Sequence, residues 1–203
     1  MVRRVRELGF PVAVSDDGSS DDTVLRAREA GAEVIEAKKN GGKGAAMKRG
    51  FEWFLARGYT ALILMDADGQ HDASDLGGFL NSLNEGPSAL IVGDRMVRPA
   101  GMPFVRRLTN RVMSRLLSSL AGQRIPDSQC GFRAMTRELV SKLRLDTDRF
   151  EIESEMLLEA ARLGFRIGSV PVRCVYGSEI SQVDPFRDTL RFLKYLFAYR
   201  ARR

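Results

Sequence analysis

Short apolar runs alternate along this chain with longer segments in which apolar residues recur every three or four positions. A short aliphatic run bounded by polar residues is typical of a buried strand, and the longer spacing is typical of an amphipathic helix. The runs predict strands at residues 10–14, 32–37, 60–65, 88–93 and 165–175. Strands that alternate with helices indicate an α/β fold in which helices flank the sheet.

The segments between the runs predict the helices. Residues 1–9 fit the end of an amphipathic helix, because Val2, Val5 and Leu8 share one face and Gly9 stops it. Further helices are expected around residues 24–27, 45–54, 76–83, 104–120, 156–161 and 186–203.

Asp66 and Asp68 come directly after the third predicted strand, and Gln70 lies two positions further on. Open α/β sheets bind ligands at the carboxyl ends of their strands, so these side chains are expected at a ligand-binding edge. Two hard carboxylate ligands suit Mg²⁺ or Mn²⁺, and the Gln70 amide offers a third oxygen. The alternative is a solvated turn in which Asp72 caps the next helix. His71 is expected to be a bystander or a supporting residue, because one histidine does not make a metal site.

Asp16 and Asp17 follow the first predicted strand in the same way. Helix capping accounts for Ser20 or Asp21, but it does not require the two paired carboxylates. An acidic side chain at this position can accept hydrogen bonds from a nucleobase or a ribose, as in other nucleotide-binding folds. Contact with a ligand and an ordinary polar turn both stay open at this point.

A glycine-rich turn, Asn40-Gly41-Gly42-Lys43-Gly44, joins the second strand to the next helix. Glycines at a helix N-terminus allow backbone N–H groups to approach an anion, and the helix dipole assists. The spacing differs from that of a Walker P-loop. A strand–helix turn without any ligand is the ordinary alternative.

The composition is that of one globular domain, which we assign to residues 1–203. Of the 203 residues 44% are hydrophobic, enough to bury one sizeable core. A net charge of +6 and a pI of about 9.7 predict an anionic partner, such as a nucleotide, a nucleic acid, a lipid phosphate or a phospholipid surface. Two cysteines make no disulfide framework, which favours reduced thiols in the cytosol. No apolar run is long enough to span a bilayer, and we find no signal peptide.

Two basic helices raise the question of membrane contact. Arg107, Arg111 and Arg115 recur every four residues and therefore line one face of the helix expected at residues 104–120. That face is either solvated or meets anionic lipid headgroups or a lipid phosphate. The basic amphipathic helix expected at residues 186–203 either lies on a membrane or docks on its own sheet.

The C-terminal half holds a further polar cluster around Asp127 and Arg133, in a loop that runs into a short strand. Glu151, Glu153 and Glu155 stand near the start of a helix, where the helix dipole favours negative charge. These three glutamates therefore need no function.

Several polar motifs each follow a predicted strand or open a helix. They are Asp16-Asp17-Gly18-Ser19 with Asp22-Thr23, Asn40-Gly41-Gly42-Lys43-Gly44 with Ala46 and Gly50, Asp66-Ala67-Asp68-Gly69-Gln70-His71, Gly93-Asp94-Arg95, and Asp127 with Gly131-Phe132-Arg133. In this order they resemble glycosyltransferase family 2, and within it the dolichyl- and polyprenyl-phosphate mannosyl- and glucosyltransferases. The resemblance implies the Rossmann-like GT-A fold, with a mixed, mostly parallel sheet flanked by helices. The resemblance extends over nearly the whole chain, and the set is far more specific than any one motif.

The resemblance implies a nucleotide-sugar donor. Asp17 is then expected to contact the nucleobase, with Asp16 beside it. Gly41, Lys43 and Gly44 are expected to lie near the nucleotide.

The resemblance also implies a divalent metal, Mg²⁺ or Mn²⁺, at the Asp-x-Asp motif. Asp66 is expected to approach the ribose or the metal, and Asp68 and Gln70 the metal. Arg95 and Arg133 resemble positions that handle the acceptor phosphate or the diphosphate. The predicted catalytic residues are Asp68, Arg95, Asp127 and Arg133.

One departure from the family concerns the N-terminus. Members open with a strand and a Pro-x-Tyr-Asn-Glu loop that holds the nucleotide, and nothing in this chain matches it. In the family's sheet that strand lies between the strands at residues 10–14 and 60–65, so its loss leaves unpaired backbone groups. We therefore expect an N-terminally incomplete domain that binds nucleotide poorly, or that pairs its open sheet edge with another chain as an oligomer.

The expected reaction is an inverting transfer from a UDP- or GDP-sugar to a polyprenyl or dolichyl phosphate, by a protein peripheral on the cytosolic face of the membrane. The metal neutralises the diphosphate leaving group. A phosphate monoester has a second pKa of about 6, so this acceptor is already anionic and needs no general base. A sugar hydroxyl would need one, and Asp127 is the first candidate. Near-normal transfer by an Asp127→Asn variant would support the phosphate acceptor.

Three alternatives stay open. The first is a family 2 enzyme that acts on a saccharide acceptor in polysaccharide or cell-envelope synthesis. The second is a sugar-phosphate nucleotidyltransferase, although the glycine-rich pyrophosphate loop expected after its first strand is not visible. The third is a catalytically inactive remnant that only binds partners or a membrane. Nucleic acid is not expected as a partner, because the arginines are spread over several elements and form no recognisable binding module.

Overall fold

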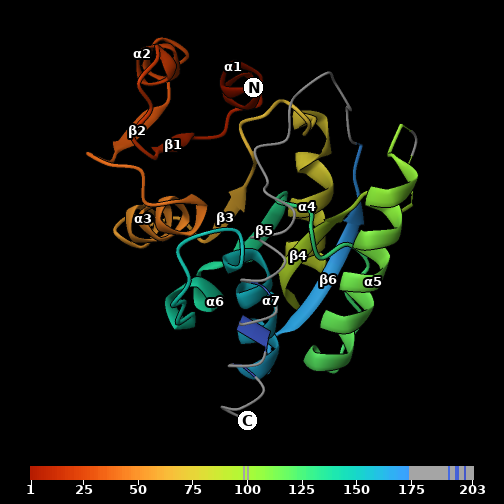
Figure 1. The fold of residues 1–203 in the computed structure, drawn as a ribbon. Coiled ribbons are helices and arrows are strands. Elements are labelled where there is room, and N and C mark those ends of the chain that lie inside the picture. Colours follow the sequence, from red (N-terminus) through yellow and green to blue (C-terminus); the bar gives the residue numbers. More distant parts are fainter. Residues whose placement is uncertain (98, 100, 174–191, 193–194, 197–198, 200–203) are drawn as a thin grey trace.

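The structure is a computed structural model that describes residues 1–97, 99, 101–173, 192, 195, 196 and 199. Its strands are β1 (Ala13–Asp16), β2 (Glu33–Glu36), β3 (Ala61–Leu64), β4 (Ser88–Asp94), β5 (Arg133–Thr136) and β6 (Arg166–Pro171) (Figure 1). Its helices are α1 (Val2–Glu7), α2 (Thr23–Glu29), α3 (Lys43–Leu55), α4 (Leu76–Glu85), α5 (Phe104–Ala121), α6 (Arg137–Lys142) and α7 (Ile152–Arg162), with a 3₁₀ turn, η1, at Ala73–Asp75. Strands and helices alternate as the hydrophobic pattern predicted.

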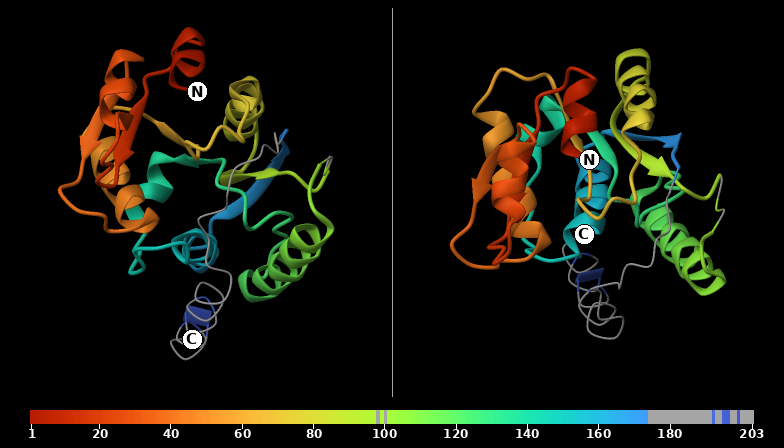
Figure 2. Two further views of the ribbon diagram at one scale, coloured as in Figure 1. Left: turned by 45° about the horizontal axis from the view of Figure 1, so that its top comes forward. Right: turned by 90° about the horizontal axis from the view of Figure 1, so that it is seen from above.

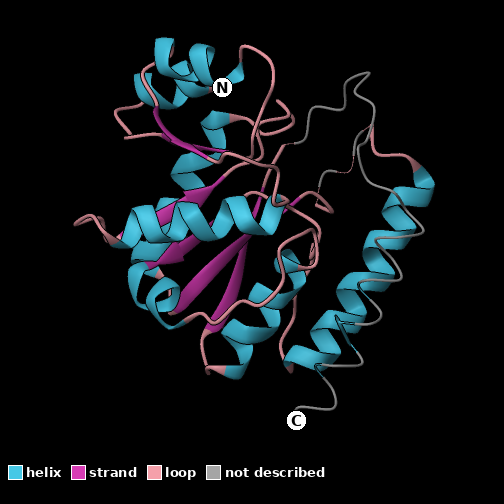
Figure 3. Ribbon diagram, turned by 60° about the vertical axis from the view of Figure 1, so that its left-hand side comes forward, coloured by secondary structure: helices cyan, strands magenta, loops and turns pink. Residues whose placement is uncertain are grey.

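The described strands form two sheets with helices packed around them (Figure 3). β1 pairs with β2 in parallel, and the second sheet has the order β3-β5-β4-β6. β4 and β6 are parallel, whereas β5 runs antiparallel to both of its neighbours. The α/β class and the mixed sheet are confirmed, and β5 makes both of the antiparallel pairings.

The two sheets share no ladder hydrogen bonds, and within the described residues no strand lies between β1 and β3. The family's first strand, which the sequence predicted to be missing, would lie in this position. Its absence from the protein stays a prediction.

One hydrophobic cluster holds the elements together. Phe54 of α3, Phe79 of α4, and Leu90 and Ile91 of β4 have almost no exposed surface and belong to the same cluster. Val5 of α1 joins it, so the N-terminal elements share their core with the larger sheet. The shared core agrees with the single domain predicted for residues 1–203, which stays a prediction.

Local details follow the chemistry of their residues. Pro171 ends β6, an edge strand of its sheet, as expected for a residue without a backbone N–H. The sequence did not predict α6, which begins where the Thr136 side chain accepts a hydrogen bond from the Leu139 N–H. Most of the helix predicted at residues 186–203 lies outside the described residues, and so does Cys174. Cys130 is a buried free cysteine, and burial raises the pKa of its thiol to about 12.

Among the described helices, none is long and apolar enough to cross a membrane.

Candidate functional site

The carboxyl ends of β3 and β4 meet the start of β5, and several predicted site residues gather there. Leu64 at the end of β3 and Val92 near the end of β4 both pair with Arg133, the first residue of β5. The loops that carry Asp66, Arg95 and Asp127 adjoin these strand ends, although they are far apart in the sequence. The fold thus brings the predicted residues of three motifs to one edge of the sheet.

Lys43, at the start of α3, bridges two carboxylates at this edge. Its Nζ lies 2.7 Å from Asp66 Oδ1 and makes a second ion pair with Glu153 of α7. Burial lowers the pKa of the Lys43 ammonium, but the charges of Glu153 and Asp66 outweigh burial and raise the pKa above its ordinary range. Lys43 is therefore a fixed cation at the strand ends.

Asp66 is a carboxylate held in its ionised form. Burial raises its pKa, but the adjacent His71 imidazole and the Lys43 ammonium outweigh burial and hold the pKa well below its usual range. His71 Nε2 lies 3.7 Å from Asp66 Oδ2, and the imidazole is buried against the Phe132 ring. His71 thus has the supporting position that the sequence allowed.

Gly131 makes room for Asp66. A Cβ at residue 131 would lie 2.7 Å from Asp66 Cγ and still closer to one carboxylate oxygen, closer than real Cβ atoms approach. Only glycine leaves space for the carboxylate at this point, which ties the loop before β5 to the loop after β3.

Asp68 and Gln70 continue the loop after β3. Asp68 is exposed, and its Oδ1 accepts a hydrogen bond of 2.9 Å from the Gln70 N–H. The described part of the chain contains no group of three or more His, Cys, Asp or Glu side chains that could hold a metal. Two carboxylates and an amide oxygen still match the hard donors that Mg²⁺ and Mn²⁺ take when substrate phosphates supply further ligands. The residues therefore fit such an ion together with a phosphate-bearing ligand.

Asp16 and Asp17 have different surroundings. Asp16 is buried and accepts hydrogen bonds from the backbone N–H groups of Gly18 and Ser19, which shapes the turn after β1. Asp17 accepts from the Gly41 and Gly42 N–H groups at 3.0 and 2.6 Å.

Arg49 of α3 adds a hydrogen bond of 2.9 Å to Asp17. Burial raises the Asp17 pKa, but the hydrogen bonds from the Gly41 N–H and Arg49 outweigh burial and bring the pKa below its ordinary value. The predicted nucleotide residues Asp17 and Gly41 are thus in direct contact.

Gly44 faces the backbone of the loop before α7. A Cβ at residue 44 would lie 2.6 Å from the Asp148 carbonyl carbon, and the Ala45 N–H donates to the Asp148 oxygen. This side of the glycine-rich turn therefore packs against protein.

Arg95 and Asp127 form a buried ion pair. Asp127 accepts hydrogen bonds from Arg95 Nε at 2.7 Å, Arg95 Nη2 at 2.9 Å and the Arg95 backbone N–H at 3.1 Å. Asn110 of α5 donates a fourth at 2.6 Å. Burial raises the Asp127 pKa, but Arg95 and Asn110 outweigh burial and lower it. The sequence did not single out Asn110, because nothing local marks the inner face of α5 as polar.

Arg133 is fully buried, and its guanidinium bonds backbone carbonyl groups. It donates to Cys130 O at 2.9 Å, Ser128 O at 2.8 Å and Glu153 O at 2.6 Å. Its position ties the loop before β5 to the start of α7. The sequence missed Glu153, whose contacts with Lys43 and Arg133 place it in the site, because the helix dipole already explained an acidic residue there.

The site combines carboxylates and cations at strand ends of an α/β fold. The family model described as glycosyl transferase family 2 matches residues 1–144, which is more than half of the chain. The chain belongs to glycosyl transferase family 2.

Curated proteins of this class are similar over most of the chain. Glycosyltransferase AglJ of Haloferax volcanii is 35% identical over 189 residues, which cover 90% of this chain and 61% of that protein. Polyprenol monophosphomannose synthase of Mycolicibacterium smegmatis is 32% identical over 174 residues, which cover 79% of this chain and 65% of that protein. Dolichyl-phosphate hexose transferase of Haloferax volcanii is 32% identical over 179 residues, which cover 88% of this chain and 76% of that protein. The chain spans less than two thirds of the length of the first two.

Solved structures confirm the fold. A crystal structure of glucosyl-3-phosphoglycerate synthase from Mycobacterium tuberculosis with Mn²⁺, UDP-glucose and phosphoglyceric acid has a TM-score of 0.69 at 22% identity, covering 92% of this chain and 67% of that one. The complex of that enzyme with Mn²⁺, UDP and phosphoglyceric acid has a TM-score of 0.68. The GT-A fold predicted from the sequence is confirmed by this likeness.

Proposed function

We propose that this chain transfers a sugar from a UDP- or GDP-sugar to a polyprenyl or dolichyl phosphate, with inversion at the anomeric carbon. Family membership supports sugar transfer, and two relatives are named for polyprenol or dolichyl phosphate. The acceptor class rests on a further observation at Asp127.

Asp127 is the observation that favours a phosphate acceptor over a saccharide. Its side chain is fully buried and already accepts four hydrogen bonds from Arg95 and Asn110. A carboxylate in this state does not present a lone pair to a sugar hydroxyl, which would need a general base. A phosphate acceptor is anionic near neutral pH and needs none. The catalytic role predicted for Asp127 becomes one of positioning Arg95.

The donor is proposed to bind across the loops after β1 and β3. Asp17 and the Gly41 backbone lie on the nucleotide side, and Lys43 lies beside the diphosphate. Asp66, Asp68 and Gln70 would hold Mg²⁺ or Mn²⁺, which when bound supplies charge to neutralise the diphosphate leaving group.

In the transfer itself, an oxygen of the acceptor phosphate attacks the anomeric carbon on the face opposite the diphosphate. A carbon–oxygen bond forms as the bond from that carbon to the diphosphate breaks, and the nucleoside diphosphate leaves with the electron pair. Lys43 counters charge that builds on the diphosphate, and Arg95 is proposed to orient the acceptor phosphate. Arg133 supports Lys43 and Arg95 by fixing the loop before β5.

A lipid acceptor places the reaction at a membrane. We propose peripheral attachment on the cytosolic face, where nucleotide sugars are made available. We propose oligomer formation through the edge of β1 or β3, each of which has no strand partner among the described residues on one side.

The proposal is tested by thermal-shift titration of the chain with UDP and GDP, each with and without Mn²⁺. A ligand that binds the native state raises the melting temperature, so a metal-dependent shift identifies the nucleotide. The exposed Asp68→Asn variant should lose the metal-dependent part and keep the melting temperature of the free chain. Transfer of labelled sugar is then compared between polyprenyl phosphate and saccharide acceptors. No shift with either nucleotide would instead support an inactive remnant, and preferred transfer to the saccharide would overturn the lipid acceptor.

A further inference from the structure

α5 has an apolar face that points away from the protein. Asn110, Ser114 and Leu117 are its buried residues and pack inward. Large apolar residues on the other side are strongly exposed: Phe104 75%, Val105 74%, Leu108 52%, Val112 55% and Leu116 39%. At 3.6 residues per turn these five side chains form one outward stripe, which we call the α5 stripe.

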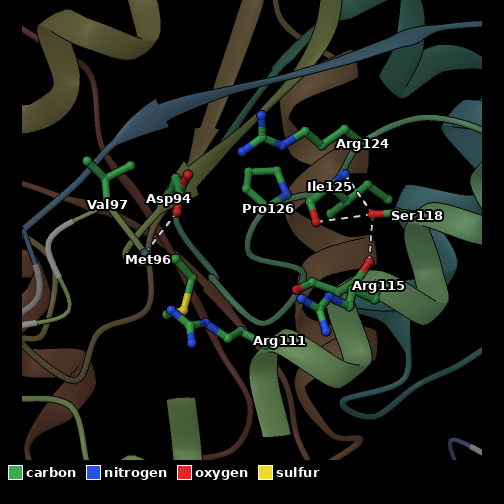
Figure 4. A pocket seen from close by; sticks show the side chains of 10 residues that line it. Asp94, Met96, Val97, Arg111, Arg115, Ser118, Arg124, Ile125 and Pro126 are labelled. Atoms are coloured by element: carbon green, nitrogen blue, oxygen red, sulfur yellow. Dashed lines mark hydrogen bonds between the residues drawn. The ribbon is translucent and has the colours of Figure 1, made fainter. Parts of the chain in front are cut away.

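A basic hollow lies along one flank of the α5 stripe. The hollow has a volume of about 600 Å³ between α5 and the ends of β4 and the loop before β5. Figure 4 shows Arg124 on one side of it and Arg111 and Arg115 on the other. Among the described residues, none of these three arginines forms an ion pair with a carboxylate. Asp94 also lines the hollow, and its charge interacts with that of Arg124. The charges of Arg111 and Arg115, across the hollow from Arg124, are available to an anion from outside.

The charge of α5 decides which partner fits its stripe. The helix carries four arginines, Arg106, Arg107, Arg111 and Arg115, and no Asp or Glu. A second copy packed through α5 would bring like charges together, which is unfavourable. A helix with apolar side chains on one face and arginines beside them has the composition of helices that lie in a membrane interface. Both views of Figure 2 show α5 at the periphery, on the far side of the molecule from β2 and α2.

We propose that α5 docks this protein on the surface of an anionic phospholipid bilayer. The α5 stripe enters the boundary between headgroups and acyl chains, and Arg111, Arg115 and Arg124 hold phospholipid phosphates in the hollow. This membrane contact rests on the proposed function, but vesicle binding is measured without nucleotide or acceptor. A chain that fails to bind vesicles is therefore distinguished from a chain that fails to transfer sugar.

The test is co-sedimentation of the full chain with vesicles of phosphatidylcholine alone or with phosphatidylglycerol added. The chain should bind the anionic vesicles at least tenfold more tightly than the neutral ones. Leu108→Ser with Val112→Ser should weaken binding about tenfold or more, since less apolar surface enters the bilayer. Arg111→Gln with Arg115→Gln should weaken it about tenfold, and added salt should reduce this difference.

Matched controls come from exposed residues on other elements. Leu25 of α2 is 56% exposed, and Leu25→Ser should leave vesicle binding unchanged. Arg3→Gln with Arg4→Gln on α1 removes the same charge as the double arginine variant and should have much less effect. Unchanged melting temperatures verify that each variant is folded.

Three outcomes would overturn the proposal. The first is a chain that does not sediment with anionic vesicles, or α5 variants that bind as well as the controls. The second is binding that needs polyprenyl phosphate in neutral vesicles and ignores phosphatidylglycerol, which would make the hollow an acceptor site. The third is an α5 double variant that changes the oligomeric state but not vesicle binding, which would make the stripe a protein interface.

Discussion

Lys43 Nζ lies 2.7 Å from Asp66 Oδ1, where the glycine-rich turn before α3 reaches the loop after β3. Glu153 holds the same ammonium from α7, so one cation connects three segments that are distant in the sequence. The contact joins the proposed nucleotide side of the site to its metal side.

Replacing Lys43 by Met should destabilise the protein. Asp66 and Glu153 would then face each other, partly buried, without a cation between them. Because the Asp66 side chain is 31% exposed, we expect a loss of about 1–3 kcal/mol in the free energy of unfolding, less than for a fully buried pair. Urea denaturation measures it, and Lys43→Arg should retain most of the stability. Equal stability of the Met variant and the wild type would contradict the structural role.

Stability should fall in acid because two site carboxylates have lowered pKa values. Folding lowers the pKa of Asp66 through His71 and Lys43 against the effect of burial, and that of Asp127 through Arg95 and Asn110. Each therefore contributes stability above the unfolded pKa of about 3.9, and this is lost as pH falls through the folded pKa. The free energy of unfolding, measured in urea from pH 7 to pH 3, should decrease below about pH 5. Asp66→Asn should make that decrease shallower, and an equally steep decrease would count against Asp66 as a source.

The sequence predicted those features that depend on neighbouring residues. The apolar runs located β1 to β4 and β6 to within a few residues, and the carboxylates after β1 and β3 marked the loops that carry the site. The same local logic failed for α6, because its start depends on one side-chain cap at Thr136 rather than on an apolar period.

Partners across the fold could not be predicted in this way. Lys43 and Glu153 are 110 residues apart, and no local pattern links them. Arg133 shows the same limit, since its sequence position suggested an anion ligand whereas the structure encloses its guanidinium among carbonyl groups. The burial of a side chain depends on how whole helices and strands pack. The sequence alone therefore does not distinguish an arginine that contacts substrate from one that fixes a loop.

Gly131→Ala should disable the site without unfolding the chain. The new methyl group would meet Asp66 Cγ at 2.7 Å, so the carboxylate must leave its place beside Lys43. We expect loss of the Mn²⁺-dependent thermal shift with nucleotide. Gly50→Ala on α3 is the matched control, since a Cβ there meets nothing, and it should stabilise the helix by up to about 1 kcal/mol. A Gly131→Ala variant with normal nucleotide binding would show that the position of Asp66 is not required.

Asp127→Asn should separate a positioning role from a catalytic base. The amide cannot accept the bidentate Arg95 guanidinium as a charge partner, and Arg95 is only 5% exposed, so we expect a loss of about 3 kcal/mol in the free energy of unfolding. Replacing both residues, Arg95→Met with Asp127→Leu, should recover much of that loss, because no buried charge is then left alone. Transfer to polyprenyl phosphate, measured per folded molecule at a temperature where Asp127→Asn is folded, should stay within about tenfold of the wild type with an unchanged pH profile. A loss of 100-fold or more that also removes the acidic limb of the pH profile would identify Asp127 as a general base, and with it a hydroxyl acceptor.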